Sequence, residues 1–132
     1  MPWIGPLKLK AQLYCGPETA MGPGKADLLD AIDREGSISA AGRAMGMSYR
    51  RTWLLVDAMN RCWAEPLVEA TAGGGRQSGA RLTDAGKAVL AAYRALESAL
   101  ASVAEGEALK TLEARMRPQP MARQAGRPED GA

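Results

Sequence analysis

The central stretch of the chain decides its fold, and residues 36–63 read GSISAAGRAMGMSYRRTWLLVDAMNRCW. Ser39 is a suitable N-cap for a short helix expected over 40–45. Ser48 can cap a longer helix that runs to residue 63 in the same way. Two helices joined by a tight turn predict a helix-turn-helix.

Small and apolar residues in this stretch have the spacing that two crossing helices require. Ala41 and Gly42 allow the helices to approach closely, and Gly46 suits a turn in which the backbone leaves the right-handed region. The remaining positions that face the crossing are mostly apolar: Met45, Met47, Thr52, Leu55 and Val56. The pattern therefore predicts that the two helices pack as one unit.

The first turns of the longer helix carry the polar and basic residues that DNA recognition requires. Arginine reads guanine through a bidentate pair to O6 and N7, which gives roughly 1–3 kcal/mol of discrimination. A serine hydroxyl or a backbone N–H at a helix start can bind phosphate. For Tyr49 and Trp53, packing within the protein and contact with DNA are both open. The DNA-binding residues predicted on this helix are Ser48, Tyr49, Arg50, Arg51 and Trp53.

A small β wing is expected after the helix pair. Residues 67–71 and 81–83 have the character of short strands, and the glycine-rich segment 72–80 reads as the tip of a hairpin. Arg76 in that tip is expected to hold the DNA backbone. The wing over 67–83 completes a winged helix-turn-helix, and the fold class is mainly α with this small β wing.

Two elements are expected before the helix pair. The alternation of leucine and lysine predicts a strand over 7–14, whereas the glycines and prolines of 15–25 predict a loop. Apolar residues on one face then predict a helix over 25–35, which Gly36 ends.

A long helix is expected over 83–105. Its apolar positions step by four and three residues, which is the spacing of a helix that packs along a partner helix. Because so small a domain has little surface left to cover this helix, pairing across a two-fold axis is preferred to packing within the monomer. The predicted dimerisation residues are Val89, Tyr93, Leu96, Leu100 and Val103.

These elements divide the chain into two parts. Residues 1–104 are expected to form the DNA-binding domain together with its dimerisation helix. Residues 105–132 are expected to contain one short helix and a disordered tail rich in proline, glycine and charge.

Composition argues against catalysis. The 132 residues include no histidine and two cysteines, so a histidine-dependent nucleophile and a zinc site built from histidine or four cysteines are both excluded. We therefore expect no enzyme activity, no metal and no cofactor. The sequence also predicts no membrane span and no signal peptide. Both cysteines are expected to be buried and inert in a reducing cytoplasm.

Charge is distributed unevenly along the chain. The net charge is only +2, from 17 lysines and arginines and 15 acidic residues. Between residues 36 and 94, however, eight basic residues accompany four acidic ones, whereas the helix expected over 25–35 is acidic. Positive charge is therefore concentrated around the helix pair and the wing, where a DNA-binding surface is expected.

The chain resembles the N-terminal DNA-binding domain of the ModE family of molybdate-responsive transcriptional regulators in three segments: GPGKADLLDAIDREGSISAAGRAMGMSYRRTWLLVDAMN, EPLVEATAGGG and LTDAGKAVLAAYRALE. The similarity covers residues 7–104. The ModE domain is in turn more distantly similar to the LysR-type helix-turn-helix. The resemblance implies that a dimer binds an operator through this domain. In the wing, Arg76-Gln77-Ser78 interrupts the longer glycine run usual in that family.

The same family senses molybdate through a separate C-terminal pair of oxyanion-binding modules. The roughly thirty residues after Val103 do not resemble such a module, so we expect no molybdate-sensing domain. The sequence thus predicts a bacterial, cytoplasmic transcription regulator that binds an inverted-repeat operator in double-stranded DNA as a homodimer, through the helix over 48–63 and the wing. It identifies no small-molecule effector. The alternative is a winged-helix protein-interaction module that does not bind DNA.

Overall fold

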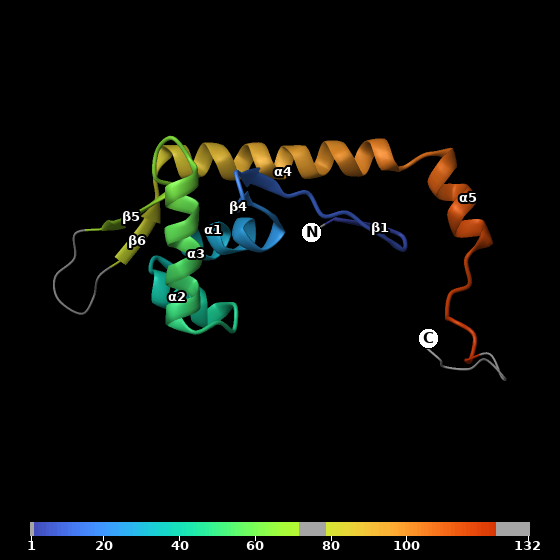
Figure 1. Ribbon diagram of the computed structural model, residues 1–132, viewed down its shortest axis with the longest axis horizontal. Helices are drawn as coiled ribbons and strands as arrows, with labels where there is room; N and C mark the ends of the chain where they lie inside the picture. The colour runs from blue at the N-terminus through green and yellow to red at the C-terminus, as the bar shows by residue number, and fades with distance from the viewer. Residues whose placement is uncertain (1, 72–78, 124–132) are drawn as a thin grey trace.

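The computed structural model describes residues 2–71 and 79–123, and these form helices and small hairpins in the order of a winged helix-turn-helix (Figure 1). The expected fold class, mainly α with a small β wing, is confirmed. In chain order the described elements are β1 (Trp3–Ile4), β2 (Leu7–Lys8), β3 (Leu13–Cys15), β4 (Glu18–Met21), α1 (Pro23–Glu35), α2 (Ile38–Ala44), α3 (Tyr49–Cys62), β5 (Val68–Thr71), β6 (Gly79–Leu82), α4 (Asp84–Ala104) and α5 (Glu107–Arg115).

Serine side chains cap the two helices of the central pair. The hydroxyl of Ser48 accepts a hydrogen bond from the backbone N–H of Arg51 at 3.1 Å, as the sequence predicts. The predicted cap at Ser39 is wrong, because α2 begins earlier. Its cap is Ser37, which has an extended backbone. The hydroxyl of Ser37 accepts a hydrogen bond from the backbone N–H of Ala40 at 3.0 Å.

The α2–α3 crossing depends on a glycine packed against a threonine. A Cβ atom on Gly42 would overlap the side chain of Thr52. Thr52 is fully buried, and its hydroxyl donates a hydrogen bond to the carbonyl of Ser48 at 2.8 Å. Gly46 adopts a φ of 71° in the turn, a conformation that a side chain disfavours. Both glycines therefore have the roles that the sequence predicts.

The hydrophobic core lies where α1, α3, the wing and the first half of α4 meet. Leu28, Leu29 and Ile32 of α1 are fully buried there. Met59 of α3 and Leu67, just before the wing, complete the centre of the core. The helix-turn-helix is therefore held against the rest of the domain by the apolar faces of α1 and α3.

The structure differs most from the expectation over residues 15–25. Glu18–Met21 form strand β4, which pairs with β3 in an antiparallel hairpin, where a loop is expected. The strand expected over 7–14 is divided between β2 and β3, which belong to different hairpins. Trp63 explains why this segment is ordered, because its indole Nε1–H donates to the carbonyl of Ala20 at 3.0 Å.

One side chain attaches the wing to helix α3. The amide of Asn60 on α3 accepts from the backbone N–H groups of Leu67 and Val68 at 2.9 and 3.1 Å, and donates to the carbonyl of Val68 at 3.0 Å. The wing itself is an antiparallel pair in which Val68 lies opposite Leu82. Thr83 then caps α4 by accepting from the N–H of Gly86 at 2.9 Å.

Helix α4 projects well beyond the core, and α5 turns away from its far end (Figure 1). The hairpin of β1 and β2 lies along the projecting half, where Ile4 and Leu109 line one cavity together with Gly106. In the described part of the chain, no helix is both long and apolar enough to cross a membrane.

Candidate nucleic-acid interface

One side of α3 is left uncovered by the rest of the domain. Thr52, Val56 and Met59 turn into the core, whereas Trp53 and Leu54 on the other side of the helix are exposed. Tyr49 is 59% exposed and Trp53 is 46% exposed, so neither packs in the core. The exposed positions along the first two turns of α3 are Tyr49, Arg50, Arg51, Trp53 and Leu54.

The start of α3 also presents backbone donors to the solvent. The first N–H groups of a helix have no intrahelical acceptor and can bind a phosphate oxygen. The Ser48 hydroxyl oxygen accepts from Arg51, which leaves its own hydrogen available as a donor. Four of the predicted DNA-binding residues thus follow one another at this end of the helix: Ser48, Tyr49, Arg50 and Arg51.

Ion pairing removes part of the positive charge that the sequence places around the helix pair. Arg61 pairs with Asp57 at 3.0 Å, and Arg81 pairs with its cross-strand neighbour Glu69 at 2.8 Å. In residues 2–71 and 79–123, neither Arg50 nor Arg51 takes part in an ion pair. Both arginines at the start of α3 therefore keep their positive charge uncompensated among the described residues, whereas three other arginines of the segment over 36–94 do not.

Arg94 on α4 is likewise committed to a structural cluster. Its guanidinium bonds Asp27 and Asp30 of α1 at 2.9 and 2.6 Å, and Glu97 at 3.0 Å. Burial opposes the charged form, but these three hydrogen bonds outweigh it and raise the pKa of Arg94 above its ordinary value. The acidic face that the sequence places on α1 is therefore partly an attachment site for α4.

The structure describes only part of the wing. Arg76 belongs to residues 72–78, which lie outside the described part of the chain. Of the described wing residues, Arg81 is exposed but already paired. The prediction that Arg76 holds the DNA backbone stays a prediction.

The predicted dimerisation residues on α4 divide into two groups. Tyr93 is only 3% exposed and donates its hydroxyl hydrogen to the carbonyl of Ala11 at 2.7 Å, and Val89 packs against the same core. Leu96 and Leu100 are each 40% exposed, and Val103 is 83% exposed. Tyr93 thus belongs to the interior and the half-buried Val89 packs at its edge, whereas Leu96, Leu100 and Val103 are the more exposed apolar residues.

The cysteines differ from their predicted state. Both are free thiols, but Cys15 is exposed and Cys62 is half-buried. Partial burial and the neighbouring Cys15 thiol raise the pKa of Cys62. The described residues contain no group of three histidine, cysteine or acidic side chains that could hold a metal ion.

Comparison with known proteins agrees with this geometry. Residues 25–87 match the family model described as bacterial regulatory helix-turn-helix protein, lysR family. The molybdenum transport protein ModE of Azotobacter vinelandii is 46% identical over 79 residues, which are 60% of this chain and 29% of that protein. The molybdenum-pterin-binding protein MopB of Rhodobacter capsulatus is 48% identical over 83 residues, 63% of this chain and 31% of that protein.

A more distant relative carries its function in its name. The DNA-binding transcriptional dual regulator ModE of Escherichia coli (strain K12) is 33% identical over 87 residues, 66% of this chain and 31% of that protein. The resemblance to ModE proteins is therefore confirmed over 79 to 87 residues of the chain. The chain spans about three tenths of the length of these relatives.

Proposed function

We propose that this chain, whose residues 25–87 form a helix-turn-helix domain of the lysR regulatory family, is a transcription regulator that binds an operator as a homodimer. The observation that carries the proposal is the exposed first half of α3. It combines the unpaired Arg50 and Arg51 with a capped helix start, on a helix anchored by its opposite face. Such a helix enters the major groove with its N-terminal residues against the base edges.

The side chains at this end of α3 have distinct roles in the proposal. Arg50 and Arg51 read bases or position the helix on phosphates, since arginine does both. Ser48 and Tyr49 bind the backbone beside them. Trp53, exposed one turn further on, contacts the wall of the groove. Arg76 of the wing holds the neighbouring backbone.

The exposed end of α4 supports the homodimer. Leu96, Leu100 and Val103 form an apolar surface at helical spacing on the projecting half of the helix. A two-fold contact between two such surfaces joins two DNA-binding domains, each with its own recognition helix. Because the two domains are related by a two-fold axis, the operator should be an inverted repeat. Its half-sites should lie about 34 Å apart, as for other such dimers.

The names of the relatives bear on regulation by molybdenum. ModE and MopB are named for molybdenum transport and for binding a molybdenum pterin, and each is about three times as long as the matched region. The described residues supply only the DNA-binding part of this proposal. We assign no molybdate-sensing function to residues 25–115.

A salt series tests the DNA-binding function. The affinity for a duplex from the chain's own upstream region should fall linearly with salt on logarithmic axes, with a slope of about −0.9 for each phosphate neutralised. An Arg50→Ala, Arg51→Ala double variant should bind weakly and with a shallower slope. The matched control, Lys110→Ala with Arg115→Ala, removes two charges from α5 and should bind as the wild type does. Unchanged binding by the α3 variant would refute the roles of these arginines.

The same surface also supports the second candidate, a protein-interaction module. Tyr49, Trp53 and Leu54 expose large apolar side chains side by side on α3, and aromatic residues are enriched at protein interfaces. Retention on heparin and binding to a random duplex separate the two functions. A protein-interaction module would show neither property.

A further inference from the structure

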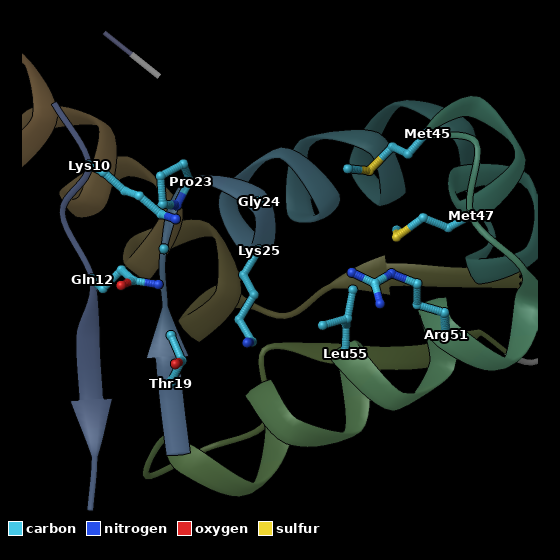
Figure 2. A pocket seen from close by; sticks show the side chains of 11 residues that line it. Lys10, Gln12, Thr19, Pro23, Gly24, Lys25, Met45, Met47, Arg51 and Leu55 are labelled. Carbon is cyan, nitrogen blue, oxygen red and sulfur yellow. The ribbon is translucent and has the colours of Figure 1, made fainter. Parts of the chain in front are cut away.

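A second basic surface lies beside the recognition helix. A cleft of about 340 Å³ opens between the start of α1 and the turn that joins α2 to α3 (Figure 2). Met45, Met47 and Leu55 form its apolar side, whereas the opposite side comes from the β3–β4 hairpin and α1. Its walls thus come from segments that are distant in sequence.

Three cationic side chains line this cleft: Lys10, Lys25 and Arg51. No acidic side chain is among the described residues that line it. In Figure 2, Lys25 and Arg51 extend into the same space from α1 and α3. Ion pairs within the described residues take up Arg61, Arg81 and Arg94, but they leave these three cations uncompensated.

Neutral groups in the cleft add hydrogen-bond donors. Gln12 and Thr19 carry polar side chains at its edge. Gly22 begins α1 without a side-chain cap, and Gly24 and Lys25 line the cleft at the first turn of the helix. Cations and hydrogen-bond donors, with no carboxylate among the described lining residues, match an anion that has several oxygens.

We propose that this cleft binds a phosphate group, which in the DNA complex belongs to the backbone beside the bases that α3 contacts. Its position supports that source, because Arg51 belongs both to the cleft and to the exposed start of α3. The assignment of this phosphate to DNA rests on the proposed function. A free phosphate ion offers the same chemistry, so the experiment has to separate the two.

The first arm of the experiment measures DNA binding. A Lys10→Gln, Lys25→Gln variant keeps Arg51 and the rest of α3 and removes two of the three cations. Its affinity for a random-sequence duplex should depend less steeply on salt, with a slope shallower by up to about 0.9, because the contact with one phosphate is lost. Lys110→Gln with Arg115→Gln is the matched control on α5, which lies at the other end of the molecule from α2 and α3 in Figure 1, and it should keep the wild-type slope.

The second arm titrates inorganic phosphate into the free protein and follows the amide resonances of Gly24 and Lys25. A shallower slope without a phosphate response assigns the cleft to the DNA backbone. A phosphate response that the variant loses, with an unchanged slope, assigns it to a free anion. An unchanged slope together with no response overturns the proposal. If the wild-type protein binds no DNA, the proposed function fails, and the phosphate titration alone decides whether the cleft binds an anion.

Discussion

Replacing Asn60 with alanine should weaken the attachment of the wing to α3 and destabilise the domain. The change removes the three hydrogen bonds of the Asn60 amide to the backbone of Leu67 and Val68, at 2.9, 3.1 and 3.0 Å. Both residues are buried, and a buried polar group without a partner costs roughly 1–3 kcal/mol. Asn60→Ala leaves three such groups without their partner. Because water can enter the space that the half-buried Asn60 vacates and satisfy part of them, we expect less than the full sum, a loss of about 2–5 kcal/mol in the free energy of unfolding.

Urea unfolding followed by circular dichroism measures this loss, and hydrogen exchange at the amides of Leu67 and Val68 locates it. Asn60→Asp keeps the oxygen that accepts two of the bonds but sets a second carboxylate oxygen against the carbonyl of Val68, so it should also destabilise the domain. Arg50→Ala, an exposed change on the same helix, should alter the stability by less than about 0.5 kcal/mol. If Asn60→Ala is no more destabilising than Arg50→Ala, the inference that Asn60 holds the wing is refuted.

Three further outcomes are expected. Gly42→Ala should destabilise the domain by about 1–3 kcal/mol in urea unfolding, because the added methyl overlaps Thr52, and adding Thr52→Ala should cost less than the two single changes summed. Leu100→Asp should shift the molar mass measured by light scattering from dimer to monomer, and a monomeric wild type would contradict the proposed interface. Arg94→Gln should cost about 1–3 kcal/mol, since it leaves the 7%-exposed Glu97 without its partner, and Glu97→Gln should restore part of this loss in thermal unfolding.

The central helix pair could be predicted because its determinants are local. Gly46 and Ser48 act within a few residues of their own position, and Gly42 meets Thr52 on the adjoining helix; the structure gives each the role read from the sequence. The predicted cap of α2 is two residues too late, because Ser37 and Ser39 are both acceptable caps. Only the extended backbone of Ser37 decides between them.

Long-range contacts account for the rest of what the sequence did not predict. Strand β4 contains no strong strand signal of its own and is held by Trp63, 43 residues away. Arg94 is counted in sequence as free positive charge near the DNA, yet Asp27 and Asp30 of α1 neutralise it. The spacing of Tyr93 alone predicts a residue of the dimer interface. In the structure its hydroxyl donates to the carbonyl of Ala11, 82 residues away, and the side chain is buried within the same chain.

Helix α4 is anchored through its first half, so a small tilt at the anchor is amplified at the far end of the helix. Arg94 and Tyr93 fix it to α1 and to the N-terminal segment, whereas the ten residues after Arg94 extend about 15 Å beyond that point at 1.5 Å per residue. A tilt of about 10° at the anchor therefore moves the end of the helix by roughly 3 Å. If two copies meet at that end, the same tilt changes the distance between their recognition helices, and the Arg94 cluster determines which spacing of half-sites the pair can span.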